Sequence, residues 1–269
     1  MSKSFKVSVV IPCFNHGEFL REAVDSVTGI KRDDIELIVV NDGSTDERTR
    51  KEMGRLEALG LNVIRQENKG LAAARNAGIH ISNGEYILPL DADNRLRPAY
   101  IDRGVQILDA NQDVGVVYGD AEFIGLETGR WYVGSFDPDR LLHWNYIDAC
   151  AIYRRSLWEQ NGGYDGTMPI QGYEDWDFWL GALEHSWRFA YVPEVLFDYR
   201  RTQGSMISRT GGFESQIEAF IAMKHSLLYR QACARIVDQQ ASLKWTLRNF
   251  RRLLESQLKQ MLRRALPPF

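Results

Sequence analysis

The chain has 269 residues, 44% of them hydrophobic and 26% charged, which suits one large α/β domain or two small ones and excludes a disordered or fibrous protein. With 33 Lys and Arg against 36 Asp and Glu, the net charge of -3 argues against a general nucleic-acid binder, which carries a basic excess. The apolar runs are too short to cross a bilayer or to form a secretory signal, and the three scattered cysteines lack a CxxC pair, as expected in a reducing cytoplasm.

The first third of the sequence alternates short apolar runs with helical patterns. The expected strands cover 6–12, 35–41, 62–66 and 85–91, and the expected helices cover 17–28, 45–60 and 71–82. In the second helix, Thr45 suits the N-cap and Gly60 the C-cap. Strand–helix–strand repeats predict a parallel sheet, in which ligands bind at the carboxyl ends of the strands. The site is therefore expected in the loops 12–17, 41–46, 66–71 and 91–98.

The pattern changes after about residue 114. The expected strands here cover 114–120, 150–154, 189–193 and 195–200, with a hairpin over 121–134, a helix over 174–186 and mostly helix over 212–266. Gly162, Gly163 and Gly166 indicate a flexible loop that faces the ligand. The fold class is thus α/β, with a mostly parallel sheet flanked by helices. We expect one domain over 1–210, in halves of about 1–113 and 114–210, and a helical extension over 211–269.

The first candidate for chemistry is the run Asn41 to Thr45, after the second strand. Asp42 is placed to accept a hydrogen bond from a base or a ribose. Gly43 allows a turn, and Ser44 or Thr45 suits the cap of the next helix. A simple strand-to-helix turn explains the same residues equally well.

The second candidate is Asp91-Ala92-Asp93, directly after the fourth strand. Two carboxylates at this spacing can turn toward one divalent cation, and Mg²⁺ or Mn²⁺ combines few carboxylates with phosphate oxygens. The pattern alone is weak, because the same spacing recurs at Asp137/Asp139 and Asp175/Asp177. Its position at the end of a buried strand distinguishes the first pair.

Two further candidates lie on helices. Glu174 and Asp175 begin a helix after the glycine-rich loop, where an ionised carboxylate can take a proton, although capping of the helix explains them as well. Arg75 lies on an Ala-rich helix that can pack closely on the sheet. We expect it to pair with Asp42 or with a phosphate, and a solvated arginine is the alternative.

Together these segments resemble the inverting glycosyltransferases of family 2, which have the GT-A fold. The matching segments are VSVVIPCFNHGEFLREAVDSV, IVVNDGSTD, ENKGLAAARNAGI, GEYILPLDAD, GGYDGTMPIQGYEDWDFWL and YRRTQGSM, in the order of the family, over about residues 5–207. Asn41 stands where the family often has a second Asp.

The resemblance implies a nucleotide-sugar donor. Its contacts are then Pro12, Phe14 and Asn15 against the nucleoside, Asp42 on the base (most often uracil), Arg75 near the nucleotide, and Asp91 and Ala92 toward the diphosphate. The resemblance also implies a divalent cation, Mn²⁺ or Mg²⁺, on Asp91 and Asp93, with Asp93 the more direct ligand. Asp175 resembles the catalytic base, and Glu174 an acceptor-binding or supporting residue. Thr202 stands where the family often has a metal-binding His.

The implied reaction moves a sugar, most often from a UDP-sugar, to a hydroxyl of a glycan or lipid-linked acceptor in polysaccharide biosynthesis for the cell envelope. A Gln-x-x-Arg-Trp motif is absent from the sequence, which argues against the processive synthases of the same family. Two alternatives stay open. A sugar-1-phosphate nucleotidyltransferase needs a glycine-rich basic loop, whereas IPCFNHGEFL contains one Gly and no Lys or Arg. A non-catalytic carbohydrate-binding protein with this fold is the other.

The last segment, 241–269, contains seven Lys or Arg and one acid, with apolar residues at helical spacing. This pattern predicts a basic amphipathic helix, which can lie on anionic lipid. Packing on the catalytic domain or on a second subunit is the alternative. We therefore expect a cytoplasmic protein with either peripheral contact to the inner membrane face or a homodimer through these helices.

Overall fold

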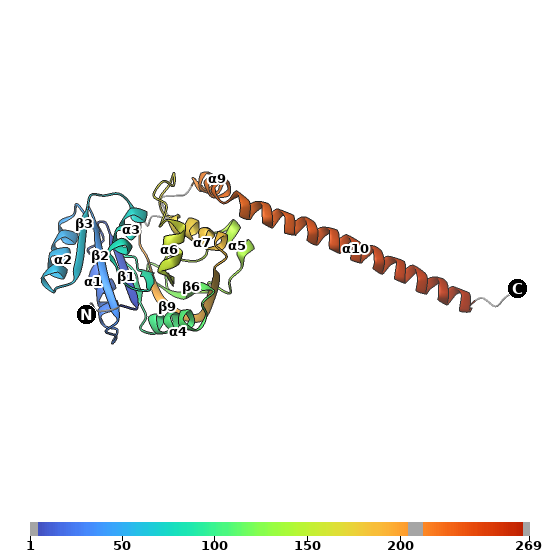
Figure 1. The fold of residues 1–269 in the computed structure, drawn as a ribbon, viewed down its shortest axis with the longest axis horizontal. Coiled ribbons are helices and arrows are strands. Elements are labelled where there is room, and N and C mark those ends of the chain that lie inside the picture. The colour runs from blue at the N-terminus through green and yellow to red at the C-terminus, as the bar shows by residue number, and fades with distance from the viewer. Residues whose placement is uncertain (1–4, 204–211, 266–269) are drawn as a thin grey trace. The chain divides into compact units, whose positions relative to one another are not determined.

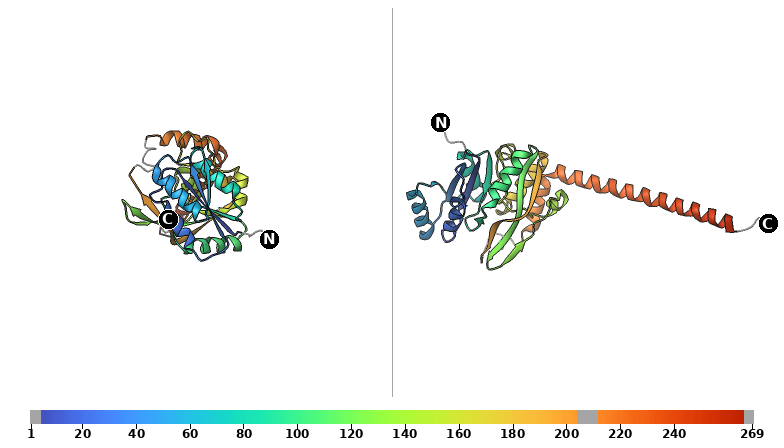
Figure 2. Two further views of the ribbon diagram at one scale, coloured as in Figure 1. Left: turned by 90° about the vertical axis from the view of Figure 1, so that its left-hand side faces the viewer. Right: turned by 90° about the horizontal axis from the view of Figure 1, so that it is seen from below.

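The computed structural model describes residues 5–203 and 212–265 (Figure 1). By its internal contacts the chain divides into two units, Met1–Lys224 and His225–Phe269. The first unit contains a single mixed sheet built from the nine strands of the described residues, in the order β3-β2-β1-β4-β8-β6-β9-β5, with β7 paired to β6. Helices cover both faces of this sheet (Figures 1 and 2).

The first half of the sheet is parallel, as predicted. Its strands are β1 (Val7–Cys13), β2 (Ile35–Asp42), β3 (Asn62–Gln66) and β4 (Tyr86–Pro89). The connecting helices are α1 (Leu20–Thr28), α2 (Glu47–Ala58) and α3 (Leu71–Ile81). Strand β1 is buried along its whole length and pairs in parallel with both β2 and β4. The apolar run over 6–12 is continuous because both faces of strand β1 are buried inside the protein.

The second half adds strands of both directions. They are β5 (Arg95–Leu96), β6 (Val114–Gly125), β7 (Gly129–Trp131), β8 (Ile152–Arg154) and β9 (Arg188–Arg201). The helices are α4 (Ala99–Ala110), α5 (Pro138–His143), α6 (Arg155–Asn161), α7 (Glu174–Glu184) and α9 (Glu214–Lys224). The predicted hairpin is present, because β6 and β7 pair antiparallel. Strand β8 is antiparallel to both β4 and β6 and so joins the two halves.

Helix α3 packs closely on the sheet because one position carries no side chain. A Cβ on Gly78 would collide with Val10 of β1 and approach Val40 of β2. This close packing fixes the height and rotation of the helix. It thereby holds Arg75, one turn earlier, at the carboxyl ends of the strands.

Several local predictions need correction. Asp46, not Thr45, caps α2, because its side chain accepts from the Thr49 amide at 2.8 Å while Asn15 accepts from the Thr45 amide. Leu59 is the C-cap, and Gly60 follows it with a positive φ of 80°. The two strands expected over 189–193 and 195–200 are one strand, β9, whose register against β6 shifts between Gly119 and Asp120.

The second unit contains α10 (Ser226–Ala265), a single helix of 40 residues. It includes most of the predicted basic helix, although residues 266–269 lie outside the described residues. Among the helices that the structure describes, none combines the length and hydropathy that a membrane crossing requires.

Candidate active site

The loops after β1 and β2 are tied together at the carboxyl edge of the sheet. Asn15, in a left-handed conformation with φ 57°, donates its amide to Ser44 Oγ at 3.1 Å. Its side-chain Oδ1 accepts from the amides of Thr45 at 2.8 Å and Asp46 at 3.2 Å. Pro12 lies within β1, whereas Phe14 is 41% exposed just beyond it. The predicted nucleoside loop is thus a fixed turn that presents one aromatic ring.

Asp42 is buried at the end of β2, and both of its carboxylate oxygens accept hydrogen bonds. Oδ1 accepts from Gln66 Nε2 at 2.7 Å and from the Lys69 amide at 2.9 Å. Oδ2 accepts from the Gly70 amide at 2.9 Å, at the N-cap of α3. A carboxylate offers about four lone-pair positions, so Asp42 fastens the start of α3 and retains capacity for one further donor.

Arg75 is buried on α3 and binds two carboxylates from distant parts of the chain. Its Nη1 donates to Glu174 Oε1 at 2.5 Å, and its Nη2 donates to Asp91 Oδ1 at 2.8 Å. The expected pairing with Asp42 is therefore wrong, and the arginine is not solvated. The nearby carboxylates raise the pKa of Arg75 against the opposing effect of burial, so it stays charged.

Asp91, Ala92 and Asp93 follow β4 as predicted. The side chain of Asp91 is 31% exposed and that of Asp93 is 17% exposed. Burial and the neighbouring Asp91 raise the pKa of Asp93 to about 6, while His16 and Arg200 oppose this shift. His16 Nδ1 lies 3.8 Å from Asp93 Oδ2, and Arg200 Nε donates to the Asp93 carbonyl at 2.9 Å.

These carboxylates fit a divalent cation that phosphate and water complete. The charge of Asp91 disfavours the ionised form of Asp93, and a cation bound by both carboxylates would remove that repulsion. Among the described residues, no group of three or more His, Cys, Asp or Glu side chains could hold a metal ion. Mg²⁺ and Mn²⁺ accept such partial protein ligation when substrate phosphates supply the rest. In the other two pairs of the same spacing, Asp137 caps α5 and Asp177 binds Lys224 at 2.9 Å, so neither of these two carboxylates is placed as a cation ligand.

Glu174 and Asp175 begin α7, and both are buried. Besides Arg75, Glu174 binds the Gly172 amide through Oε2 at 2.9 Å, so both of its oxygens are used within the protein. Asp175 Oδ1 accepts from the Trp176 amide at 2.8 Å and from Asn145 Nδ2 at 2.9 Å. Burial and the adjacent Glu174 raise the pKa of Asp175 well above its ordinary value. A carboxylate with a raised pKa suits proton transfer.

One chain of contacts connects the predicted site residues. Asp42 holds Gly70, and Gly70 lies against the side chain of Gln171, in the loop that leads to Glu174. Glu174 is joined through Arg75 to Asp91. The end of β2, the end of β4 and the start of α7 are therefore connected by direct contacts, and their joint role as one site remains a prediction.

The structure adds residues that sequence patterns did not indicate. Asn145 and Asp148 lie on the irregular segment between α5 and β8. Burial and the charge of Asp91 raise the pKa of Asp148 to about 7, and Asp148 in turn raises the pKa of Asp175. Asp148 thus interacts through its charge with both the expected metal ligands and the expected base. A single Asp outside any motif gives no signal in one sequence.

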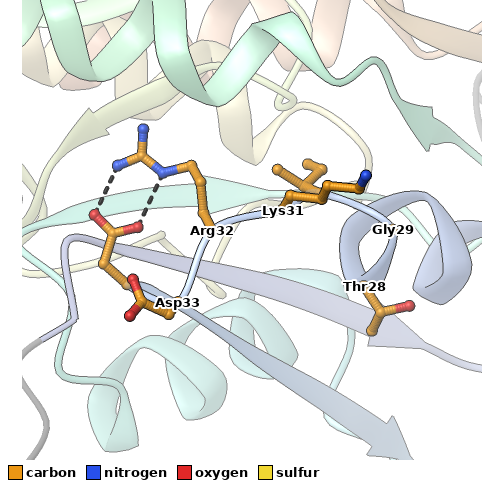
Figure 3. Close-up of a pocket in the computed structure, with 7 residues that line it drawn as sticks. Thr28, Gly29, Lys31, Arg32 and Asp33 are labelled. Carbon is orange, nitrogen blue, oxygen red and sulfur yellow. Dashed lines mark hydrogen bonds and ion pairs between the residues drawn. The ribbon is translucent and has the colours of Figure 1, made fainter.

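A separate hollow lies at the opposite edge of the sheet (Figure 3). It is lined by residues 28–34, which precede β2 and so lie at the amino ends of the strands. Arg32 is held there by Asp34 at 2.6 Å and by Asp102 at 2.7 Å. The Arg32 guanidinium is thus already paired with two carboxylates, and no catalytic role is assigned to this hollow.

Comparison with known proteins identifies the family to which the chain belongs. Residues 8–171 match the family model described as "Glycosyl transferase family 2". The chain is 30% identical over 209 residues to the uncharacterized protein y4gI of Sinorhizobium fredii, covering 74% of this chain and 23% of that protein. It is 28% identical over 226 residues to the putative glycosyltransferase EpsH of Bacillus subtilis, covering 76% of this chain and 63% of that protein. The chain thus spans only part of the length of these relatives.

Solved structures share the fold. Residues 1–349 of TarS from S. aureus, in complex with UDP-GlcNAc, superpose with a TM-score of 0.62 at 19% identity, over 76% of this chain and 61% of that one. The mannosyltransferase PcManGT from Pyrobaculum calidifontis, in complex with GDP-Man and Mn²⁺, gives a TM-score of 0.59 at 20% identity, over 77% and 60%. These likenesses confirm the predicted α/β fold class. Because the family model matches more than half of the chain, the protein belongs to glycosyl transferase family 2.

Proposed function

We propose that the chain transfers a sugar from a UDP-sugar to a hydroxyl of a glycan or lipid-linked acceptor, with inversion and without processive elongation. One observation carries the proposal. The guanidinium of Arg75 binds both Asp91 and Glu174, which brings the candidate cation ligands and the candidate base to one edge of the sheet. The complexes of TarS with UDP-GlcNAc and of PcManGT with GDP-Man support a nucleotide-sugar donor.

The donor binds along the carboxyl ends of β1, β2 and β4 in this proposal. Phe14 offers an exposed ring for the base, between Pro12 in β1 and Asn15, whose side chain binds the loop after β2. Asp42 accepts one further hydrogen bond from the base. The diphosphate lies beside Asp91 and Ala92 in this proposal, although the Ala92 side chain itself is buried in the core. Arg75 contacts carboxylates rather than phosphate, so its role is to hold the two sides of the site together.

Asp91 and Asp93 would hold the divalent cation, Mn²⁺ or Mg²⁺. When bound, such a cation offsets the negative charge that develops on a diphosphate leaving group. The PcManGT complex with Mn²⁺ supports this assignment. Thr202, half-buried just after β9, adds no His, Cys, Asp or Glu to the pair.

The chemistry is a single displacement. The acceptor hydroxyl gives its proton to Asp175 while its oxygen forms a bond to the anomeric carbon. The bond from that carbon to the diphosphate oxygen breaks, and UDP leaves. The transition state has oxocarbenium character, and one displacement inverts the configuration. Glu174 supports Asp175 and does not accept the proton, because both of its oxygens are bound within the protein.

The test is Asp175→Asn, with Asp177→Asn as the matched control. Asp177 is also buried in the first turn of α7, but it binds Lys224. A thermal-shift panel of UDP-, GDP- and dTDP-sugars with Mn²⁺ first identifies the donor, since ligand binding raises the melting temperature. Release of the nucleoside diphosphate, with water or a glycan as acceptor, should then fall by about 10²–10⁴-fold in Asp175→Asn alone. Donor binding should persist. An Asp175→Asn protein with wild-type turnover would remove the base from this mechanism.

The same assay separates the alternatives. A nucleotidyltransferase releases pyrophosphate rather than UDP, and a carbohydrate-binding protein releases neither. Membership of glycosyl transferase family 2 favours the transferase over both.

We also propose that α10 lies on an anionic membrane surface, where lipid-linked acceptors are found. The helix contains nine Lys or Arg and two Asp or Glu, a net charge of +7 in a chain whose net charge is -3. Ile236, Leu243 and Leu247, which share one helical face, are 51–60% exposed. The α10 helix of a second copy would bring an equal positive charge against this helix, whereas anionic lipid complements it. Lipid is therefore the partner that the charge favours.

A further inference from the structure

The candidate base receives a hydrogen bond from outside its own helix. Asn145 Nδ2 donates to Asp175 Oδ1 at 2.9 Å, across 30 residues of sequence. The amide of Trp176 donates to the same oxygen at 2.8 Å. No described residue donates a hydrogen bond to Oδ2. The two oxygens of the carboxylate are thus unequal, with Oδ1 bound twice and Oδ2 left available.

The segment that carries Asn145 is fixed to α7 on both sides of this contact. Trp176 Nε1 donates to the Leu141 carbonyl at 2.6 Å, and Trp179 Nε1 donates to the Ile147 carbonyl at 3.0 Å. Both indoles are buried. Because two rigid side chains of α7 hold the backbone before and after Asn145, its amide is positioned before any substrate binds.

The other end of the same amide has no partner among the described residues. Asn145 Oδ1 is buried and accepts no hydrogen bond from any of them. A buried carbonyl oxygen without a donor reduces stability, so an apolar side chain of similar shape would suit packing better. At Asn145 the hydrogen bond from Nδ2 to Asp175 Oδ1 accounts for an asparagine at this position.

We propose that Asn145 is a positioning residue for Asp175: its amide holds Oδ1 and leaves Oδ2 as the oxygen that accepts the proton. This inference rests on the proposed role of Asp175 as base. It concerns the orientation and charge of that carboxylate, and Asn145 itself need not touch the substrate.

The charges around Asp175 explain why such a donor is needed. Glu174 on the same helix and Asp148 before β8 both disfavour its ionised form, as does burial. Arg75 on α3 favours the ionised form, and Tyr164, after α6, adds a neutral phenol whose pKa is itself raised. Donors to a carboxylate stabilise its charged state. Asn145 therefore helps to keep the base ionised without adding a charge to the site.

The chain supplies a matched control. Asn161 also donates its amide to α7, to the Phe178 carbonyl at 2.9 Å, and its Oδ1 is likewise buried without a partner. It has no hydrogen bond to Asp175. Asn161→Ala thus removes a similar amide contact with α7 and leaves the base untouched, which separates positioning from general support of the helix.

The experiment is a titration of the Asp175 carboxyl carbon by ¹³C NMR in the 269-residue chain labelled at aspartate. The Asp175→Asn spectrum assigns the resonance, and neither donor nor acceptor is required. In Asn145→Ala the pKa of Asp175 should rise by about 1–2 pH units above that of the wild type, the size expected for losing a hydrogen bond to a charged group. Asn145→Leu, which keeps the approximate size of the side chain and adds no charge, should raise it as well and serves if the alanine variant does not fold. In Asn161→Ala the pKa should equal that of the wild type.

An Asp175 pKa in both Asn145 variants equal to that of the wild type would overturn the inference, as would an equal rise in Asn161→Ala. Such a result leaves the proposed function intact. Conversely, full turnover by Asp175→Asn would remove the proposed base whatever the titration shows. In the active protein the acid limb of the pH profile for UDP release should follow the NMR pKa.

Discussion

Arg75 and Glu174 are separated by 99 residues in the sequence, yet Nη1 of one lies 2.5 Å from Oε1 of the other in the buried interior. The same guanidinium also reaches Asp91. Breaking such a buried pair leaves carboxylates without a counter-charge. Arg75 is therefore the structural junction between the donor side and the base side of the candidate site.

The junction predicts a large loss of stability when the charge is removed. Arg75→Gln should lower the free energy of unfolding by about 3–5 kcal/mol, because Glu174 and Asp91 lose their shared cation. Arg75→Lys keeps the charge but not the two-pronged geometry, so its loss should be smaller. Urea unfolding at neutral pH measures both variants.

The control for Arg75 is Arg65→Gln. Arg65 pairs with Glu57 at 2.9 Å, but the two side chains are 48% and 41% exposed. Such a pair contributes about 0–1 kcal/mol. If Arg75→Gln is no more costly than Arg65→Gln, the buried junction does not stabilise the fold.

The parallel half of the sheet could be predicted from the sequence because its strands are buried on both faces and are separated by clear helical patterns. Strand β3 was predicted with its bounds unchanged, and β1 and β2 to within one residue. Helix α4 was not predicted, although its buried residues Tyr100, Ile101, Val105 and Leu108 recur at helical spacing. The strand β5, which pairs with the far end of β9, has two residues and is too short to show a periodic pattern.

The candidate site also contains residues that could be predicted from the sequence and residues that could not. Asp42, Asp91 and Asp175 could be located because each stands at the end of a recognisable strand or the start of a helix. Asn145 and Asp148 could not, since their segment has neither periodicity nor motif and its position depends on contacts with α7. The partners of Arg75 were also out of reach, because sequence spacing carries no information about contacts between such distant residues.

Asp148 predicts a specific dependence of stability on pH. Its pKa is raised from 3.8 to about 7 in the folded protein, so the folded state binds more protons than the unfolded state between these values. Stability should therefore fall as the pH rises through this window. Asp148→Asn removes the effect and keeps an acceptor for the Cys150 amide. The variant should be more stable than the wild type above the window, by up to about 4 kcal/mol, and equally stable below it.

Melting temperatures across the window test this prediction. Asp33→Asn is the control, because Asp33 is exposed on the loop before β2. If the melting temperatures of the wild type and Asp148→Asn differ by the same amount at every pH, the pKa of Asp148 is not raised in the folded protein.

The cation site predicts that donor binding depends on metal. UDP with Mn²⁺ should raise the melting temperature of the wild type more than UDP with EDTA, because bound ligand stabilises the folded state. In Asp93→Asn this difference should vanish, whereas the stabilisation by UDP alone should remain. Asp137→Asn, a helix cap with the same sequence spacing, should behave as the wild type toward metal. Full turnover in excess EDTA would contradict a role for the cation.

The membrane proposal predicts that sedimentation with lipid depends on both faces of α10. The 269-residue chain should sediment with vesicles containing phosphatidylserine, dissociate from them at high salt, and remain in solution with pure phosphatidylcholine. Arg248→Gln with Arg252→Gln should weaken binding about 30-fold, at about 1 kcal/mol per basic residue. Leu243→Gln with Leu247→Gln should weaken it through the apolar face, since both leucines are about 60% exposed.

The matched control for the charge on α10 is Lys51→Gln with Arg55→Gln, which removes two exposed basic residues from α2. It should bind vesicles like the wild type, because membrane attraction on this proposal depends on where the charge lies rather than on the net charge of the chain. A concentration-dependent dimer that the leucine variants abolish, without vesicle binding by the wild type, would instead assign the apolar face of α10 to a second copy of the chain.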